Sequence, residues 1–262
     1  MTAPLNLNAD LGESFGAWRM GDDPALLQLV QSANIACGFH AGDPLVMQNT
    51  VRAALQAGVS LGAHPSYPDL QGFGRRALKC SAEEVEAFVL YQLGALDGFA
   101  RANGARVTHV KPHGALSNEA CRNAELAGAI ARAVAAYDPR MILLAPALSA
   151  LAEAGAREKM CVALEIYADR AYEDDGQLTP RGEAGAVLHD PQQSLAHVEA
   201  MLAAGGLKSR SGKFLPTPIH SICVHGDGPE AIATARLLKA RLAENFVLAP
   251  LPALFASTPA SA

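Results

Sequence analysis

The chain has 262 residues, of which 50% are hydrophobic and 18% are charged, and its formal net charge is −5 at pH 7. This composition is typical of a globular protein with a large apolar core, and the negative charge argues against binding to nucleic acid or to an anionic membrane surface. The five cysteines are an odd number without a C-x-x-C pair, which argues against a disulfide framework or a zinc ribbon and predicts a cytoplasmic location.

Short apolar runs alternate with helical segments along the whole chain. The seven runs predicted as strands are residues 5–11, 34–37, 59–63, 107–110, 141–144, 161–166 and 222–224, and residues 246–248 form a candidate eighth strand. The predicted helices are residues 24–32, 44–58, 81–103, 123–136, 148–155, 192–204 and 229–244. Two helix starts carry typical signals, which are Asp43 before Pro44 and a capping box that begins at Ser81.

Continuous apolar runs without alternation indicate strands that are covered on both faces, and therefore a parallel sheet. Seven or eight strand–helix units in a chain of this length match a (β/α) barrel. A doubly wound open sheet is the alternative, but the sequence has neither a G-x-G-x-x-G turn after the first run nor a G-x-x-x-x-G-K-[ST] phosphate loop. We therefore predict the α/β fold class, with a single (β/α) barrel over residues 1–252 and a flexible tail over residues 253–262.

Five of the predicted strands end in ionisable side chains. These are Asp10 and Glu13, Cys37 and His40, His64, Lys111 and His113, and His225 and Asp227. In barrel and doubly wound folds, the carboxyl ends of the strands form the rim at which ligands bind and chemistry occurs. Each cluster alone has a structural reading, but five in the same position predict an active site.

The polar residues Asn6, Asn8 and Asp10 alternate within the first strand and therefore face one side. Inside a barrel they are costly unless they bind one another or a ligand, and capping of the next element is an alternative role for Asp10. A structural role is also open for His40, which lies on a turn between two glycines. Cys37 has no base at a recognisable spacing and is expected to pack rather than to act as a nucleophile.

The loop after His64 carries Tyr67, Arg75 and Arg76. A guanidinium group binds a carboxylate or a phosphate through two hydrogen bonds, so the arginine pair is a candidate for anion binding, with an exposed surface pair as the alternative. Burial is expected to lower the pKa of Lys111 toward neutrality, which would suit acid–base catalysis or stabilisation of an oxyanion.

The sixth strand ends near Glu165, Asp169 and Arg170. The long polar loop that follows is either a solvated loop or a mobile lid. His225 and Asp227 precede the start of a helix, where an anion can bind.

Six segments together resemble the LamB/YcsF family, which supplies the A subunits of the bacterial ATP-dependent 5-oxoprolinase. They are residues 7–13 (LNADLGE), 34–43 (NIACGFHAGD), 62–69 (GAHPSYPD), 111–116 (KPHGAL), 168–172 (ADRAY) and 224–227 (VHGD). The resemblance extends over residues 4 to 250. One departure is Ser117, where the family usually has a tyrosine before Asn118, and this puts the substrate preference in question.

The resemblance implies a distorted, seven-stranded (β/α) barrel like that of glycoside hydrolases and polysaccharide deacetylases. It implies hydrolysis of 5-oxo-L-proline to L-glutamate coupled to ATP hydrolysis, with ATP and Mg²⁺ as co-substrate, no organic cofactor, and two partner subunits, B and C. A homo-oligomer is left open. Because the sequence shows no nucleotide-binding loop, the partners are expected to handle ATP partly or wholly.

Within that chemistry, the general base for water is expected to be Asp10 or Asp169. His64 and His113 would transfer protons, with Glu13 and His40 as further catalytic candidates, and Lys111 would stabilise charge on the oxygen or phosphate. The expected substrate-binding residues are Asn8, Tyr67, Arg75, Arg76, Arg170, His225 and Asp227.

Two other functions are kept as alternatives. The first is a metal-dependent hydrolase or deacetylase, in which Asp10, His40 and His64 would hold a divalent metal ion. The second is a non-catalytic protein that binds the substrate for its partner subunits.

Overall fold

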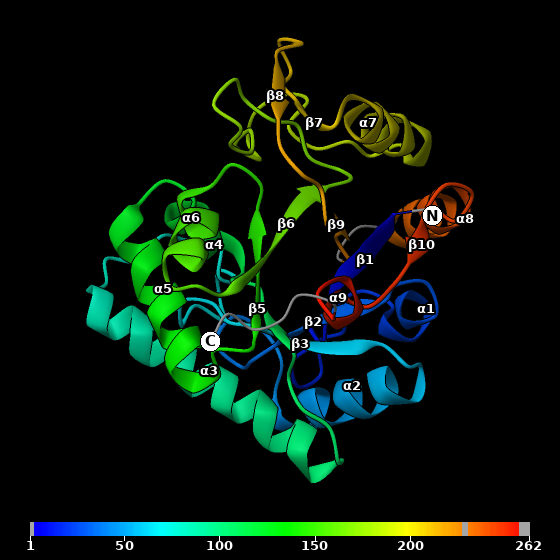
Figure 1. Ribbon diagram of the computed structural model, residues 1–262. Coiled ribbons are helices and arrows are strands. Elements are labelled where there is room, and N and C mark those ends of the chain that lie inside the picture. Colours follow the sequence, from blue (N-terminus) through cyan, green and yellow to red (C-terminus); the bar gives the residue numbers. More distant parts are fainter. Residues whose placement is uncertain (1–2, 227–229, 257–262) are drawn as a thin grey trace.

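The computed structural model describes residues 3–226 and 230–256, and its centre is a closed barrel of seven parallel strands (Figure 1). The strands are β1 (Pro4–Leu11), β2 (Ser32–Ala36), β3 (Ser60–His64), β4 (His109–Val110), β5 (Ile142–Pro146), β6 (Cys161–Tyr167) and β9 (Ser221–Val224). β9 closes the barrel by pairing with both β6 and β1. The predicted α/β class and the distorted seven-stranded barrel are confirmed.

The candidate eighth strand is present but does not belong to the closed ring. β10 (Val247–Leu248) pairs only with the start of β1, at Pro4 and Leu5. β9 pairs with β1 from Asn6 onward. The first strand therefore changes its neighbour along its length, and this irregularity is one part of the distortion of the barrel.

The helices lie around the outside of the barrel (Figure 1). They include α1 (Asp23–Leu27), α2 (Pro44–Gln56), α3 (Ala82–Ala102), α5 (Ala124–Tyr137), α6 (Ala150–Arg157), α7 (Pro191–Ala204) and α8 (Ala231–Leu242). Both predicted start signals are confirmed. The Asp43 side chain accepts hydrogen bonds from the first turn of α2, and Ser81 and Glu84 form the capping box of α3.

Three features were not predicted. They are α4 (Gly114–Ala120), α9 (Leu251–Leu254) and the antiparallel hairpin of β7 (Gly206–Lys208) and β8 (Phe214–Pro216). α4 has no side-chain cap, so no capping signal marks its start in the sequence. The hairpin and α7 stand beyond one side of the barrel, at the top of Figure 1.

The C-terminal segment continues past the predicted end of the barrel domain at residue 252. α9 extends to Leu254, and Leu251 is fully buried. Residues 257–262 of the predicted tail lie outside the described residues, so the division between domain and tail stays a prediction. Within the described residues, we find no helix with the length and apolar character that a membrane span requires.

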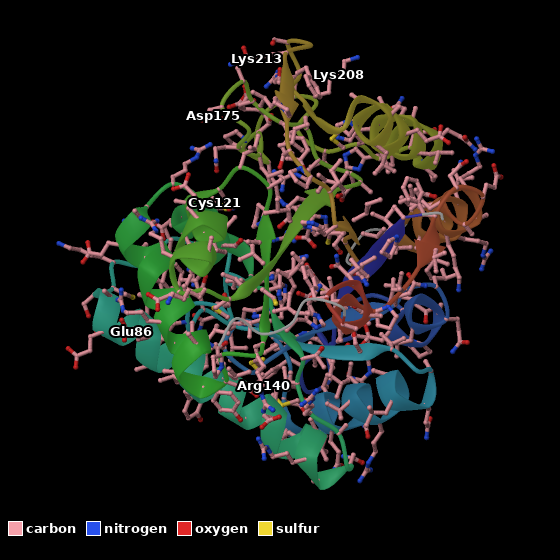
Figure 2. All side chains as sticks on the ribbon, in the orientation of Figure 1. Glu86, Cys121, Arg140, Asp175, Lys208 and Lys213 are labelled. Atoms are coloured by element: carbon pink, nitrogen blue, oxygen red, sulfur yellow. The ribbon has the colours of Figure 1, made fainter. Side chains whose placement is uncertain are left out.

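The barrel interior is polar, whereas the layer between strands and helices is apolar. From β1, Leu5, Leu7 and Leu11 belong to the apolar layer. The alternating Asn6, Asn8 and Asp10 are buried inside the barrel, where they form hydrogen bonds with polar side chains of other strands, as the sequence pattern predicted. Charged side chains such as those of Glu86 on α3 and of Lys208 and Lys213 at the hairpin project outward (Figure 2).

Candidate active site

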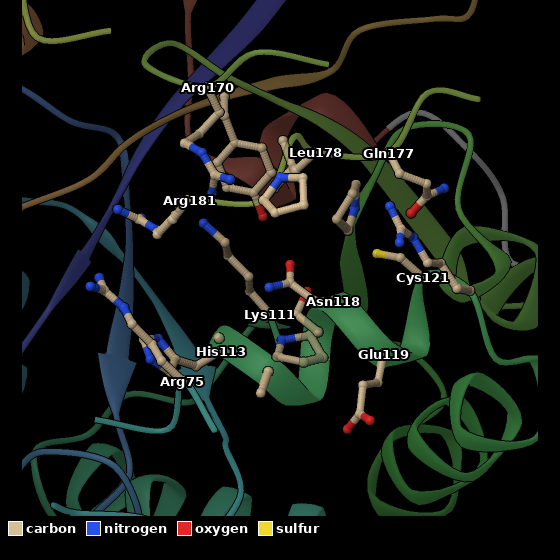
Figure 3. Close-up of a pocket in the computed structure, with 18 of the residues that line it drawn as sticks. Arg75, Lys111, His113, Asn118, Glu119, Cys121, Arg170, Gln177, Leu178 and Arg181 are labelled. Carbon is tan, nitrogen blue, oxygen red and sulfur yellow. The ribbon is translucent and has the colours of Figure 1, made fainter. Parts of the chain in front are cut away.

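A cavity of about 670 Å³ opens at the carboxyl ends of the strands (Figure 3). Residues from β1, β3, β5, β6 and α4, and from the loops after β4 and β6, line it. Among the predicted site residues, those that line the cavity are Asp10, His64, Arg75, Lys111, His113, Arg170 and His225. The barrel therefore brings together side chains that are up to 215 positions apart, and the prediction that they converge at one rim is confirmed.

Lys111 lies at the floor of the cavity and is 2% exposed. Its Nζ lies 3.0 Å from Asp10 Oδ1, 3.2 Å from Glu165 Oε2 and 2.9 Å from Cys223 Sγ. Burial alone would lower the pKa of Lys111, but the charges of Asp10 and the neighbouring acidic groups raise it well above its ordinary value. The predicted fall toward neutrality is therefore wrong, because the sequence did not show that two carboxylates flank this amine.

Asp10 joins the lysine to the histidines. Its Oδ1 accepts hydrogen bonds from Lys111 Nζ and, at 2.9 Å, from Asn34 Nδ2, while its Oδ2 lies 3.3 Å from His64 Nε2. Burial raises the pKa of Asp10, but His64 and Lys111 outweigh it and hold the pKa well below the ordinary value. Asp10 is thus an anion that positions its neighbours, which makes it a poor acceptor for a proton from water.

A layer of polar side chains beneath the cavity supports Lys111 and Asp10. Asn8 donates to Glu165 Oε1 at 2.7 Å and to Ser221 Oγ at 2.8 Å, and it does not line the cavity. The predicted contact between Asn8 and substrate is therefore corrected to a positioning role. Glu165 and Cys223 were not predicted as site residues, although Glu165 is an acidic residue within an apolar run.

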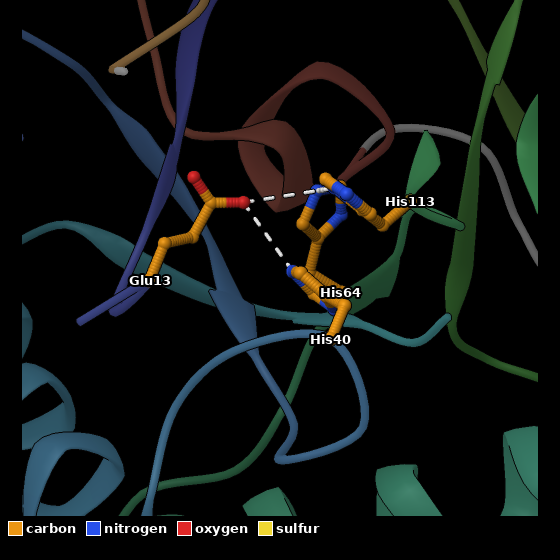
Figure 4. Close-up of side chains that lie close together, drawn as sticks. All are labelled: Glu13, His40, His64 and His113. Carbon is orange, nitrogen blue, oxygen red and sulfur yellow. Dashed lines mark hydrogen bonds and ion pairs between the residues drawn. The ribbon is translucent and has the colours of Figure 1, made fainter. Parts of the chain in front are cut away.

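Glu13, His40, His64 and His113 form a second group, here called the histidine cluster (Figure 4). His40 Nε2 lies 3.3 Å and His113 Nδ1 lies 3.6 Å from Glu13 Oε1, and His113 Nδ1 lies 2.9 Å from His64 Nε2. The rings of His40 and His113 stack with their centroids 3.8 Å apart. Burial, reinforced by neighbouring imidazoles, holds the pKa values of His40 and His113 well below the ordinary value, so both rings are neutral.

His225, which follows β9, and Asp169, which follows β6, form a third group. The Asp169 oxygens lie 2.8 and 2.9 Å from His225 Nδ1, and the imidazole stacks on Tyr167 with ring centroids 5.3 Å apart. Burial raises the pKa of Asp169, but His225 and nearby arginines lower it below its ordinary value. A carboxylate that binds one ring nitrogen orients the other to accept a proton. The predicted site residue Asp227 lies outside the described residues.

The arginines separate into those that line the cavity and one that does not. Arg75 lies over the Phe73 ring at 5.1 Å and lines the cavity, whereas Arg76 is 62% exposed and pairs with Asp69. The prediction that Arg76 binds substrate is therefore wrong, since its guanidinium is committed to an outer turn. Arg122 and Arg181 line the cavity but were not predicted.

Arg170 is buried and helps to shape the long polar loop. It donates to the backbone oxygens of Thr179 and Ala186. Residues 176–181 of this loop form one wall of the cavity (Figure 3). The loop is thus part of the site rather than only a solvated connection, while its movement as a lid stays a prediction.

Tyr67 does not line the cavity, whereas Ser117, the departure from the family pattern, does. Tyr67 is 1% exposed and donates to Glu119 Oε2 at 2.7 Å, so its contact with substrate is corrected to support of a cavity residue. Ser117 lines the cavity from α4. Cys37 packs in the core as expected. Its burial raises the pKa of the thiol to about 12, which disfavours the thiolate that a nucleophile needs.

Two side-chain groups in the described residues could hold a metal ion. They are the histidine cluster and the set of Asp10, Cys223 and His225. The expected set of Asp10, His40 and His64 is not assembled in this form, because the ammonium of Lys111 lies 3.0 Å from Asp10 and His40 faces Glu13. The carboxylate grouped with the three imidazoles is that of Glu13.

Comparisons with known proteins agree with these observations. The model of the LamB/YcsF family matches residues 5–254. A protein of Azoarcus sp. (strain BH72), named as the A subunit of 5-oxoprolinase, is 64% identical over 239 residues, which are 91% of this chain and 93% of that one. The protein of the same name from Methylococcus capsulatus is 54% identical over 243 residues, which are 93% and 94% of the two chains.

Solved structures show the same fold. A lactam utilization protein from Thermus thermophilus superimposes with a TM-score of 0.88 and is 42% identical, covering 94% of this chain and 99% of that one. A structure described as T48 deacetylase with substrate has a TM-score of 0.52 at 15% identity, covering 99% and 94% of the two chains. The second likeness concerns the barrel alone.

Proposed function

The chain belongs to the LamB/YcsF family, as its motifs predicted, and from this premise we propose that it opens the lactam ring of 5-oxo-L-proline to give L-glutamate. The names of the relatives from Azoarcus and Methylococcus and of the lactam utilization protein from Thermus support this substrate. The naming of the two relatives as A subunits supports a multi-subunit enzyme, in which this chain works with subunits B and C.

The chemistry explains why ATP is required. A lactam carbonyl is a poor electrophile, and opening its ring is close to balanced or uphill. Transfer of a phosphoryl group from ATP to the amide oxygen activates the ring carbon toward water. Water adds to that carbon, the ring C–N bond breaks as the nitrogen takes a proton, and a second water releases phosphate from the resulting acyl phosphate to leave L-glutamate. Because the sequence has no recognisable nucleotide loop, we assign ATP and its Mg²⁺ to the partner subunits and the hydrolytic half of the reaction to this chain.

The charge of the cavity is the observation that carries this assignment. Among the described residues that line it, five side chains are cationic, those of Lys111, Arg75, Arg122, Arg170 and Arg181, and two are carboxylates, those of Asp10 and Glu119. One carboxylate, as in 5-oxoproline, needs a single guanidinium partner. The excess of positive charge fits a substrate that carries a phosphoryl group as well.

Roles for individual groups follow from their contacts. Lys111, held by Asp10 and Glu165 at the cavity floor, would stabilise negative charge on the carbonyl or phosphoryl oxygen. His225, oriented by Asp169, would accept the proton of the attacking water. His225 thus takes the role of general base that was expected of Asp10 or Asp169 from the sequence. The lowered pKa of Asp169 suits a carboxylate that orients His225.

The test is reconstitution of the full-length chain with purified subunits B and C from the same organism. With all three subunits present, we expect L-glutamate and ADP to form from 5-oxoproline in equal amounts. When this chain is left out, subunits B and C should still consume ATP, but no glutamate should form. Glutamate formation by this chain with 5-oxoproline and ATP alone would contradict the proposed division.

Two arginines provide a matched comparison for the cavity. Replacing Arg75 with Gln removes a cationic side chain from the lining, whereas Arg76→Gln removes one from an outer turn. We expect kcat/KM for 5-oxoproline to fall about tenfold or more in the first variant and to stay within twofold in the second. Equal effects would remove the cavity from the proposal. Loss of binding without loss of kcat throughout such a series would favour a non-catalytic role in substrate binding.

A further inference from the structure

The histidine cluster is not used by the reaction proposed above, yet all four of its side chains are nearly buried. Glu13 follows β1, His40 follows β2, His64 ends β3 and His113 follows β4. Their side chains are between 0% and 7% exposed. Four consecutive strands of the barrel therefore each contribute one metal-binding type of side chain to one point beside the cavity (Figure 4).

The hydrogen bonds at the outer edges of two rings determine where the protons lie. His64 Nδ1 is 2.6 Å from the backbone oxygen of Lys111, and His113 Nε2 is 2.9 Å from that of Phe73. A carbonyl oxygen only accepts hydrogen bonds, so each of these nitrogens carries a hydrogen. The other two nitrogens, His64 Nε2 and His113 Nδ1, face each other at 2.9 Å, and without a hydrogen or a metal ion between them both would present lone pairs.

Two facing lone pairs at this distance require a positive centre between or beside them. A proton shared between the two rings is one solution, and a metal ion bound by both nitrogens is the other. The surroundings are negative, since Glu13 Oε1 lies 3.6 Å from His113 Nδ1 and Asp10 Oδ2 lies 3.3 Å from His64 Nε2. His40 is held from one side only. Its buried Nδ1 has no hydrogen-bond partner among the described residues, whereas its Nε2 lies 3.3 Å from Glu13 Oε1.

The separations between the donor atoms match a small tetrahedral ion. Ligand atoms about 2.0–2.2 Å from zinc lie roughly 3.3–3.6 Å from one another along the edges of a tetrahedron. Three edges of the cluster are 2.9 Å, 3.3 Å and 3.6 Å, and all four donor atoms lie within 4.8 Å of one another. Small shifts of the side chains would therefore convert this arrangement into a bound one.

We propose that Glu13 Oε1, His40 Nε2, His64 Nε2 and His113 Nδ1 form a closed, four-coordinate site for Zn²⁺. Imidazole and carboxylate donors suit zinc, and the backbone oxygens of Lys111 and Phe73 are the outer partners that orient zinc-bound imidazoles. Four protein ligands leave no position for substrate. The ion therefore ties together the carboxyl ends of β1 to β4 and holds one wall of the cavity in place, without entering the chemistry.

The site is tested on full-length protein that carries no histidine tag. After chelation and dialysis, Zn²⁺ is titrated by calorimetry at neutral pH, and the bound metal is counted by elemental analysis. We expect one Zn²⁺ per chain, a higher Tm in the zinc-bound protein, and the strong visible absorption of four-coordinate Co²⁺ when cobalt replaces zinc. A crystal soaked with Zn²⁺ should show anomalous density about 2.0–2.2 Å from the four donor atoms.

Matched variants separate this site from other imidazoles. His40→Gln and Glu13→Gln keep a polar side chain of similar length, and each should weaken Zn²⁺ binding at least about 100-fold and abolish the rise in Tm. His220→Gln, at the opposite end of the barrel, should bind Zn²⁺ as the unmodified chain does. The proposal is overturned if chelated protein takes up no stoichiometric Zn²⁺, if Co²⁺ gives only the weak spectrum of six-coordinate ions, or if His220→Gln loses the metal as His40→Gln does.

Discussion

The two ends of the barrel interior are both polar, but they are built differently. At the amino end, Asn6 donates to Ser32 Oγ at 2.9 Å and to the backbone oxygen of Ala249 at 2.8 Å, and Ser221 donates to Asn6 Oδ1 at 2.7 Å. Ser32 and Ser60 bind each other at 2.7 Å. This end is a neutral network whose members satisfy one another.

The carboxyl end instead gathers ionic groups beside a cavity. Lys111, Asp10 and Glu165 are almost fully buried, and each depends on opposite charge nearby. A neutral pair can be lost at modest cost, whereas a buried charge without its partner is strongly destabilising. The amino end thus closes the barrel with neutral groups, whereas the carboxyl end places its costly charged groups at the cavity to which we assign the chemistry.

The largest effect is expected from Lys111→Met, which leaves the Asp10 and Glu165 carboxylates buried beside an apolar chain. The free energy of unfolding in urea should fall by about 3–5 kcal/mol. Glutamate formation by the reconstituted enzyme should fall about 10²–10³-fold. Lys208→Met, on the exposed hairpin, is the control and should change neither quantity. A stable, active Lys111→Met protein would remove the proposed contrast between the two ends.

A smaller effect is expected from Asp169→Asn, because the amide no longer favours the His225 ring orientation with a basic nitrogen toward the cavity. We predict a decrease of kcat by about 10²-fold with little change in KM, measured by glutamate formation. Asp175→Asn, on the exposed part of the loop, tests for a general effect of losing a carboxylate. A change in KM alone would assign His225 to binding rather than to proton transfer.

The pH dependence of stability sharpens the comparison at the middle of the barrel. Burial lowers the pKa of His109 to about 3, so the unfolded chain binds its proton near pH 6.5 and the folded protein does not. The free energy of unfolding is therefore unaffected by protonation of His109 above pH 6.5. As the pH falls below this value, the unfolded chain takes up the proton and the free energy of unfolding decreases, by about 2 kcal/mol at pH 5. His40 and His113 act in the same direction.

The measurement is the free energy of unfolding at pH 7 and pH 5 in the presence of a chelator. Between these values, His109→Gln should lose about 2 kcal/mol less than the unmodified chain. Parallel curves for the two proteins would show that His109 does not remain neutral in the folded protein.

The smallest effect is expected from Asn6→Leu at the amino end. The change leaves Ser32, Ser221 and the Ala249 carbonyl without one partner each, and the free energy of unfolding should fall by about 1–3 kcal/mol. The values of kcat and KM should stay within twofold of the unmodified enzyme, since Asn6 does not line the cavity. A large decrease in kcat would show that the neutral network also controls the chemistry.

Much of the fold could be predicted because its signals are local. The apolar runs, the Asp43 and Ser81 caps and the seven strands of the barrel are all signalled by neighbouring residues, and the structure confirms them. The missed elements lack such signals. α4 has no cap, and the β7–β8 hairpin is two three-residue strands within a polar region.

The candidate site could be predicted in its membership but not in its pairings. The sequence places Asp10, His64 and Lys111 at strand ends, which is sufficient to expect them at one rim of a barrel. It does not show that Arg76 turns outward to Asp69 while Arg75 faces the cavity, because adjacent residues in a loop carry no periodic pattern.

By itself, the sequence determined the barrel, the rim and the family, because hydrophobic period, capping chemistry and motifs are all contained within short segments. Only the tertiary structure decided the state of each group. The pKa of Lys111 rises rather than falls because Asp10 and Glu165, which lie over 50 positions away in the sequence, flank its amine. The His109 ring likewise occupies the space that a side chain at Gly62 would fill, which the sequence around either residue does not show. Charge states depend on distances across the barrel, and no short segment of chain contains both ends of such a distance.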